Sequence, residues 1–358
     1  MMKKIRIGNR WIGDSEPLYF VADIGANHDG DLDRAYQLIE TAKEAGADAA
    51  KFQNFQADTI VSKEGFESLG DKLSHQKSWK KSVYEVYENA SLPYEWIPKL
   101  KERCDNVGLD YFTSPYDFDS VDQADPYVDI YKIGSGDITW LEIIEYIARK
   151  GKPVMIATGA SEMKDVMQAM EVLQSFTNDI VLMQCNTNYN ASKSNMRYIN
   201  LRVLETYRAQ FPNVLLGLSD HTLGYETVVG AVALGAVVFE KHFTDDNSRE
   251  GPDHKFSMTP VRWKKMVQRA NELYLALGDG QKRIEENEIE SAIVQRRALR
   301  YTQNFDPDHL LQPCDIIPLR PFQSDGISPD RIKEVIGKRL VKDVRSQSCV
   351  RWEDIQKC

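Results

Sequence analysis

The stretch DIYKIGSGDITWLEIIEYIARKGKPVMIA, residues 129–157, decides the fold prediction. It contains two short apolar runs, at 129–133 and 153–157, separated by a helical pattern over 140–149. Apolar, β-branched runs that alternate with helical segments are typical of βα units in a parallel sheet. This stretch therefore predicts a strand, a helix and a second strand.

The same alternation continues in both directions along the chain. Eight runs are predicted as strands: residues 18–24, 49–52, 110–113, 129–133, 153–157, 180–183, 214–218 and 237–241. The predicted helices are residues 32–45, 93–106, 140–149, 164–176, 196–210, 225–234 and 260–277. An open doubly wound sheet also alternates strands and helices, but eight strands in one uninterrupted series favour closure into a (β/α)8 TIM barrel.

Two parts of the chain depart from this alternation. Residues 54–92 are too long for a plain βα loop, and such an insertion can form an active-site lid or an oligomer contact. After about residue 278 the pattern becomes charged and helical, and then turns into short apolar runs broken by Pro, Asp and Gly. We predict a barrel domain at 1–278, a linker at 279–294 and a small β-rich domain at 295–358 that is stabilised by contacts outside itself.

Composition excludes several classes of protein. The net charge of −9 argues against a broad nucleic-acid interface, although a pocket for a small anion needs only a few cations. The five cysteines are widely spaced and form no CxxC pair, so neither a disulfide framework nor a zinc ribbon is expected. The N-terminal residues resemble no export signal, and no apolar run is long enough to span a membrane. A cytoplasmic enzyme is the expectation.

Polar residues follow every predicted strand, where a TIM barrel builds its active site. They are Asp23, Asn27 and His28; Lys51 and Gln53; Thr113 and Ser114; Lys132, Ser135 and Asp137; Thr158; Thr187 and Tyr189; Ser219, Asp220 and His221; and Glu240, Lys241 and His242. Lysines with hydroxyls and glycine-flanked turns suit an anion that carries a phosphate and a carboxylate. Each lysine alone would more often be a solvated charge, but Lys51 and Lys132 both lie in apolar strand contexts.

Two histidines are candidate metal ligands. His221 and His242 follow the seventh and eighth strands, which are neighbours in a closed barrel, so both imidazoles could bind one divalent ion. A lone histidine is usually a hydrogen-bonded structural residue. Two of them at adjacent strand ends make a metal site and a structural role comparable alternatives.

Several motifs, taken in order, resemble the sialic acid synthase family, the phosphoenolpyruvate-dependent nonulosonate synthases. They are ADIGANHDGD (22–31), GADAAKFQ (46–53), TSPYD (113–117), YKIGSGDIT (131–139), GKPVMIATGAS (151–161), GLSDHTLG (217–224), EKHF (240–243) and GPDHKFS (251–257). The tail, with LRPFQSDGISP (319–329) and IGKRLVKDV (336–344), is similar to the antifreeze-like (SAF, β-clip) domain of that family.

The resemblance implies a reaction and a set of roles. C3 of phosphoenolpyruvate would attack the open-chain aldehyde of an N-acylated amino sugar, such as N-acetylmannosamine or a 2,4-diacetamido-trideoxyhexose. Water would add at C2, and phosphate would leave by C–O cleavage. A divalent metal, usually manganese with magnesium or cobalt as alternatives, would act as Lewis acid and template.

The roles that the resemblance implies fall into four groups: His221 and His242 for the metal; Lys51, Ser114, Lys132, Ser135 and Ser219 for phosphoenolpyruvate; Gln53, Tyr189 and Asp253 for the sugar; and Arg320 for the active site of a partner subunit in a domain-swapped homodimer. Thr158 and Thr187 are further candidates for substrate binding, and Asp23 and Asp137 are the catalytic candidates.

This chain departs from the family at several of these positions. Asp23 and Asp137 stand where the family usually has Glu, which shortens both carboxylates by one methylene. The family usually has Ser at the position of Ala157, and some members have Asn at the position of Thr187. The usual RPG is here Arg320, Pro321 and Phe322. A divergent sugar substrate is the simplest interpretation, and a weakened or lost activity is the alternative.

Three alternatives remain open from the sequence. Asp137 could move the proton of the attacking water, or it could only cap the helix that begins near Trp140. Lys132 could be the nucleophile of a metal-independent Schiff-base aldolase on the same fold. The chain could also be a catalytically inert sugar-binding protein.

Overall fold

A computed structural model of the protein describes residues 3–73, 76–77, 79–189 and 192–356. The chain divides into two compact units, Met1–Gly278 and Asp279–Cys358. The described part of the first unit contains one eight-stranded parallel sheet. Its strands are β3 (Tyr19–Asp23), β4 (Ala49–Asn54), β5 (Asp110–Pro115), β6 (Tyr131–Ile133), β7 (Val154–Ala157), β8 (Ile180–Cys185), β9 (Leu215–Asp220) and β10 (Val238–His242).

The strand order identifies a closed TIM barrel. The order is β5-β4-β3-β10-β9-β8-β7-β6, so the last strand pairs with the first and every strand lies beside its neighbours in sequence. The barrel is completed where β5 contacts β6. A doubly wound sheet reverses its strand order at a switch point, and this sheet does not. The barrel prediction is confirmed, and the open-sheet alternative is wrong.

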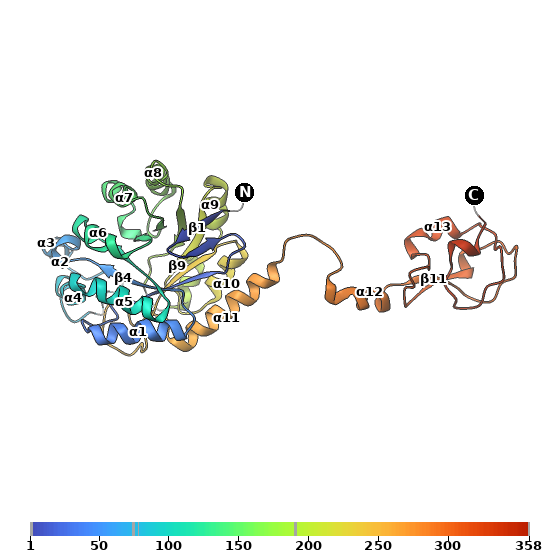
Figure 1. Ribbon diagram of the computed structural model, residues 1–358, viewed down its shortest axis with the longest axis horizontal. Helices are drawn as coiled ribbons and strands as arrows, with labels where there is room; N and C mark the ends of the chain where they lie inside the picture. Colours follow the sequence, from blue (N-terminus) through green and yellow to red (C-terminus); the bar gives the residue numbers. More distant parts are fainter. Residues whose placement is uncertain (1–2, 74–75, 78, 190–191, 357–358) are drawn as a thin grey trace. The chain divides into compact units, whose positions relative to one another are not determined.

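Helices follow the strands and surround them (Figure 1). They are α1 (Leu32–Glu44), α5 (Ile97–Val107), α6 (Phe118–Ala124), α7 (Leu141–Ala148), α8 (Met163–Gln174), α9 (Val203–Gln210), α10 (Glu226–Ala233) and α11 (Pro260–Leu277). Their apolar faces cover the outside of the barrel, which explains why the strands are apolar throughout instead of alternating. Among the described residues, no helix is long and apolar enough to cross a lipid bilayer.

Two helix predictions need correction at their ends. The predicted helix at 196–210 is a 3₁₀ helix, Lys193–Tyr198, followed by α9. Asn200 between them has a φ of 50°, a left-handed conformation that Asn tolerates but a continuous α-helix does not allow. The predicted helix at 93–106 begins with a 3₁₀ turn, Tyr94–Trp96, and only then continues as α5.

The sequence analysis missed an N-terminal hairpin. Strands β1 (Lys4–Ile7) and β2 (Arg10–Gly13) pair antiparallel around a Gly8–Asn9 turn. Arg10 forms ion pairs with Asp48 and Asp110, which directly precede or begin β4 and β5. The hairpin therefore packs at the amino ends of these strands, the end of the barrel away from the predicted site.

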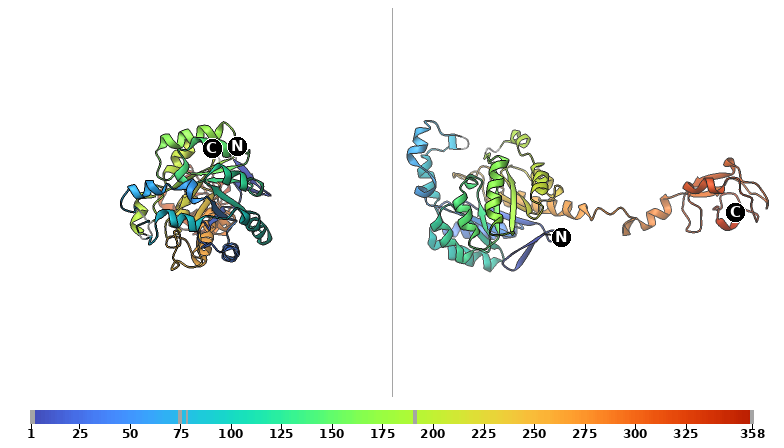
Figure 2. Two further views of the ribbon diagram at one scale, coloured as in Figure 1. Left: turned by 90° about the vertical axis from the view of Figure 1, so that its left-hand side faces the viewer. Right: turned by 90° about the horizontal axis from the view of Figure 1, so that it is seen from above.

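The 54–92 insertion contains helices α2 (Ala57–Ile60), α3 (Lys63–Ser68) and α4 (Val83–Ala90). The right-hand view of Figure 2 shows it, in light blue, projecting from the body of the first unit. Ser82 and Glu85 form a reciprocal capping box that begins α4. Phe55 joins the insertion to the barrel, because its ring contacts both Tyr87 in α4 and Tyr116 after β5.

The second unit has its own small apolar core. Strands β11 (Ala298–Tyr301) and β12 (Ile316–Leu319) pair antiparallel, and isolated β-bridges join several of the loops. Two short helices, α12 (Ile289–Gln295) and α13 (Ile332–Val335), also belong to this unit. The core includes Leu299, Tyr301, Leu311 and Val350, each with no measurable exposure.

Candidate functional site

A cavity of about 360 Å³ opens at the carboxyl ends of the barrel strands. Twelve of the predicted site residues line it: Asp23, Lys51, Gln53, Ser114, Lys132, Ser135, Asp137, Tyr189, Ser219, His221, His242 and Asp253. They come from strands that are far apart in sequence. Closure of the barrel brings them to one place.

Two buried lysines form the cationic part of the cavity. Lys51 and Lys132 are 2% and 3% exposed. Nζ of Lys51 lies 2.8 Å from Oδ2 of Asp23 and donates to Ser114 Oγ at 3.4 Å. Nζ of Lys132 lies 3.2 Å from Oε1 of Glu240. Each buried cation therefore has a carboxylate beside it, as buried charges require.

Glu240 joins the two lysines; the sequence analysis listed it with the eighth strand but assigned it no role. Its Oε1 accepts from Ser219 Oγ at 3.1 Å and lies 3.9 Å from Lys51 Nζ. Burial would raise the pKa of Glu240, but Lys132 and Lys51 outweigh it and lower the pKa to about 2. Its position two residues before His242 was the available signal, because alternate residues of a strand share a face.

Two imidazoles lie next to this cationic part. The ring centres of His221 and His242 are 5.4 Å apart. Nδ1 of His221 lies 3.0 Å from the carbonyl oxygen of Asn186, so Nδ1–H donates and Nε2 keeps its lone pair. Burial and the neighbouring imidazole lower the pKa of His221 to about 3, and burial lowers that of His242 to about 4. Both rings are neutral near pH 7 and able to ligate a cation.

The arrangement around His242 fits a divalent metal with open coordination positions. Nδ1 of His242 is buried and has no hydrogen-bond partner among the described residues, although Oδ2 of Asp253 is 3.7 Å away. Nε2 lies 3.5 Å from Oδ2 of Asp23. Within the described part of the chain, no group of three or more His, Cys, Asp or Glu side chains is close enough to hold an ion alone. Two imidazoles would therefore need water or substrate as further ligands.

Asp137 lies in the cavity at the end of a 3₁₀ turn, Ser135–Asp137, after β6. The cap position of α7 belongs to Trp140, and no side-chain hydrogen bond caps this helix. The capping interpretation of Asp137 is therefore wrong. Burial raises the pKa of Asp137 from its ordinary value of 3.8 to about 6, and Lys132 only partly opposes this. A carboxyl with this pKa is suited to accept a proton near neutral pH.

Three residues at the other side of the cavity could contact a second substrate. Nε2 of Gln53 donates to Oδ2 of Asp23 at 3.4 Å. The ring of Tyr189 stands edge-on to His221 with centres 4.5 Å apart. Oδ2 of Asp253 accepts from the backbone N–H of Ala26 at 3.4 Å, and burial raises its pKa.

Three predicted residues are not among the described residues that line the cavity. Thr158 donates to the carbonyl of Met183 at 3.0 Å and accepts from the hydroxyl of Tyr207 at 2.8 Å. Thr187 packs its methyl group against Gly159, where an added Cβ would lie 2.5 Å from it. Arg320 lies in the second unit and donates through Nε to the carbonyl of Gln295 at 2.6 Å. Their substrate-binding roles stay predictions.

The cavity has an apolar wall that the sequence analysis did not assign. The wall consists of Phe55, Ile60, Trp79, Val86, Tyr87, Ala90 and Tyr116. Most of them come from residues 54–92, whose role was left open between a lid and an oligomer contact. The cavity thus has a charged side at the strand ends and an apolar side at the insertion.

Known proteins resemble this chain over most of its length. The family model described as "NeuB family" matches residues 38–282. The N,N'-diacetyllegionaminic acid synthase of Legionella pneumophila is 34% identical over 96% of each chain. The pseudaminic acid synthase of Campylobacter jejuni is 32% identical over 98% of this chain and 100% of its own.

A solved structure is also similar. The N-acetylneuraminic acid (sialic acid) synthetase of Leptospira borgpetersenii, crystallised with citrate, is 27% identical with a TM-score of 0.71. The similarity covers 81% of this chain and 95% of that one.

Proposed function

Because the chain belongs to the NeuB family, we propose that it condenses phosphoenolpyruvate with an N-acylated amino-sugar aldehyde, giving a nonulosonic 2-keto-3-deoxy acid and phosphate. The observation that carries the proposal is one cavity with two buried lysines on one side and two buried imidazoles beside them. The lysines suit the phosphate and carboxylate of phosphoenolpyruvate. The imidazoles suit a metal that receives the aldehyde.

The chain's own residues would divide the work as follows. Lys51 and Lys132, with the hydroxyls of Ser114, Ser135 and Ser219, would hold the anion. His221 and His242 would hold a divalent metal, for which we propose manganese. When bound, the metal would supply Lewis acidity and a template for both substrates.

The carboxylates have separate tasks in this proposal. Asp137 would take the proton from the water that adds at C2 of phosphoenolpyruvate, because it lines the cavity and burial raises its pKa to about 6. Asp23, which contacts Lys51 and lies near His242, would orient both sides of the site. Gln53, Tyr189 and Asp253 would face the sugar.

The apolar wall favours one kind of aldehyde. Among the described residues that line the cavity, the cations are Lys51 and Lys132 at the strand ends, and the insertion contributes apolar and aromatic side chains. A sugar phosphate would bring a second anion to this apolar side, where the described cavity residues of this chain offer it no cation, at a large desolvation cost. We therefore propose an uncharged sugar whose acyl or methyl groups contact the wall.

The Schiff-base alternative makes a different prediction. A nucleophilic lysine must be a neutral amine, and the ion pair between Lys132 and Glu240 needs the ammonium. A phosphate-release assay with phosphoenolpyruvate, manganese and a panel of N-acylated amino-sugar aldehydes separates the mechanisms. We expect release that EDTA abolishes. Release in EDTA, with substrate trapped by borohydride, would support the Schiff base, and binding without release would indicate an inert sugar-binding protein.

Three further parts of the account stay predictions. They are the antifreeze-like identity of residues 295–358, the domain-swapped homodimer in which Arg320 reaches the cavity of a partner, and the cytoplasmic location.

A further inference from the structure

The loop between β10 and α11 carries Asp253 into the cavity. Asp253 makes few contacts of its own there, since its Oδ2 accepts from Ala26 N at 3.4 Å and lies 3.7 Å from His242 Nδ1. The following residue, His254, points away from the cavity and is 0% exposed. The carbonyl oxygen of Asp253 accepts from Oγ of Ser257 at 2.7 Å, and the direction of its side chain depends on how the neighbouring His254 is held.

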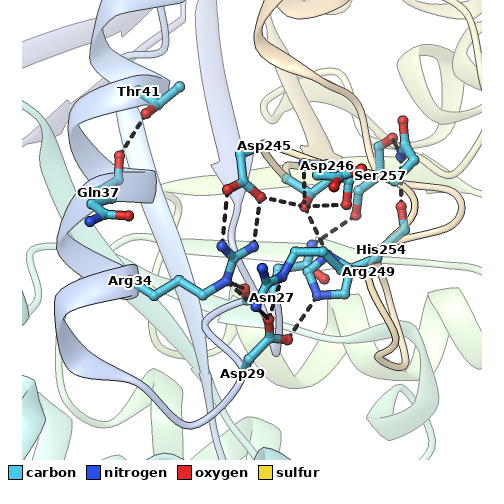
Figure 3. A network of polar contacts seen from close by, with 12 residues as sticks. Asn27, Asp29, Arg34, Gln37, Thr41, Asp245, Asp246, Arg249, His254 and Ser257 are labelled. Carbon is cyan, nitrogen blue, oxygen red and sulfur yellow. Dashed lines mark hydrogen bonds and ion pairs between the residues drawn. The ribbon is translucent and has the colours of Figure 1, made fainter.

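His254 is fixed at both ring nitrogens (Figure 3). Its Nε2 lies 2.8 Å from Oδ1 of Asp29, and because a carboxylate only accepts, Nε2–H is the donor. Its Nδ1 lies 2.8 Å from Oγ1 of Thr244, near the start of the same loop. The ring thus ties the β10–α11 loop to Asp29, which belongs to the β3–α1 loop.

Asp29 is itself held by two arginines through its other oxygen. Oδ2 accepts from Nε of Arg249 at 2.8 Å and lies 3.0 Å from Nε of Arg34. Arg34 also donates to both oxygens of Asp245, at 2.9 and 2.6 Å. Figure 3 shows these contacts as one network between the two loops. Both oxygens of Asp29 are occupied by residues of the protein, so its carboxylate is bound away from any substrate.

Two glycines let the backbone approach these side chains closely. A Cβ on Gly251 would lie 2.6 Å from Cδ2 of His254, so the backbone at Gly251 packs directly against the imidazole. A Cβ on Gly25, whose φ is +51°, would lie 3.0 Å from Oδ2 of Asp253. The His254 ring and the Asp253 carboxylate are therefore each seated against backbone.

We propose that Asp29 and His254 are positioning residues that hold the Asp253 carboxylate beside His242, where it accepts a hydrogen bond from a hydroxyl of the aldehyde substrate. This inference rests on the proposed function, which assigns Asp253 to the sugar. Neither Asp29 nor His254 touches the cavity, and both act through Asp253. Residues that orient a ligand in this way typically change affinity or rate by about 10- to 100-fold when they are replaced.

Two variants test the proposal. Asp29→Asn keeps the shape of the side chain and removes its charge, and Gly251→Ala pushes on the His254 ring without changing any polar group. Asp165→Asn is the matched control, because Asp165 accepts from Glu162 N at the start of α8 and takes no part in the network. We expect KM for the aldehyde to rise at least about tenfold in both variants and KM for phosphoenolpyruvate to change less than about twofold. A smaller folded fraction would lower kcat and leave both KM values unchanged.

Hydrogen exchange gives a second readout that needs no turnover. We expect the backbone amides of residues 253–257 to exchange at least about tenfold faster in Asp29→Asn and Gly251→Ala than in the wild type, and at the wild-type rate in Asp165→Asn. Unchanged exchange in the two variants would overturn the positioning role, as would unchanged KM for the aldehyde. A wild-type protein that releases no phosphate with any aldehyde would contradict the proposed function instead. The exchange result would still show whether Asp29 and His254 hold the Asp253 loop in place.

Discussion

Nζ of Lys51 lies 2.8 Å from Oδ2 of Asp23, and both side chains are 2% exposed. The same oxygen of Asp23 is 3.5 Å from Nε2 of His242. A single carboxylate therefore connects the cationic part of the cavity to the imidazoles. Replacing it should affect the stability of the protein as well as its activity.

Asp23→Ala removes the carboxylate nearest to the buried Lys51 and leaves it the hydroxyl of Ser114 and the more distant carboxylate of Glu240, 3.9 Å away. We expect the free energy of unfolding to fall by about 3–5 kcal/mol, as when one member of a buried ion pair is removed. Asp105→Ala is the control, because its ion pair with Lys101 is exposed and should contribute less than about 1 kcal/mol. Urea unfolding of the three proteins measures both changes. Equal and small decreases in the free energy of unfolding of the two variants would contradict a stabilising ion pair between Asp23 and Lys51.

Asp137→Asn should abolish turnover and keep the fold. The side chain keeps its shape but can no longer accept the proton of the attacking water. Phosphate release measures turnover, and circular dichroism checks the fold. Asp165→Asn is the control, because it makes the same substitution at a surface residue. Near-normal turnover in Asp137→Asn would remove this residue from the mechanism.

The pH dependence of the reaction should report the same residue. Because the pKa of Asp137 is raised to about 6, its base form is lost as pH falls through that value. We expect kcat/KM to fall about tenfold per pH unit below 6 and to level off above it. Asp137→Glu, if active, should keep this acid limb with a shifted midpoint. A profile that is flat between pH 5 and 7 would show that another group is the base.

The free energy of unfolding should change with pH in the direction opposite to kcat/KM. A folded pKa above the unfolded value means that Asp137 contributes stability below about pH 4, which is lost as pH rises through about 6. Asp137→Asn should therefore be more stable than the wild type at pH 8, by about 1–3 kcal/mol, and show no such gain at pH 3. Urea unfolding at the two pH values measures the difference.

The apolar wall should set the choice of aldehyde. Trp79→Ala removes a large ring from the insertion side of the cavity. We expect KM to rise at least about tenfold for an aldehyde with methyl or acyl groups and to change little for phosphoenolpyruvate. The exposed Trp11, replaced in the same way, is the control. A higher kcat/KM of the wild type for a 6-phosphorylated sugar than for the same sugar without phosphate would contradict the proposal that the apolar wall contacts an uncharged sugar.

The barrel could be predicted from the sequence because each of its parts is a local pattern. Eight apolar runs, separated by helical segments, specify the strands, and the position of Lys51 or His242 after a strand specifies the end of the barrel. The polar residues read after the strands include eleven of the twelve predicted residues that line the cavity, and Asp253 came from the family resemblance. These predictions needed no knowledge of contacts between distant residues.

The remainder depends on contacts that no local pattern records. Asp137 could not be separated from a helix cap until Trp140 was found at the cap position. The hydroxyl of Thr158, which follows a strand like the others, is taken up by Met183 and Tyr207. Trp79 and Tyr87, which belong to the long insertion, also line the cavity. Long insertions follow no period, so their direction is set by packing alone.

The most direct test of the central claim follows the bridging oxygen of phosphoenolpyruvate. The protein is incubated with manganese, an N-acylated amino-sugar aldehyde and phosphoenolpyruvate labelled with ¹⁸O between C2 and phosphorus, and the released phosphate is analysed by mass spectrometry. Condensation by water addition at C2 and C–O cleavage predicts the label in phosphate, together with a new 2-keto-3-deoxy acid. Label retained in the keto acid, or no phosphate release with any aldehyde of the panel, would contradict the account.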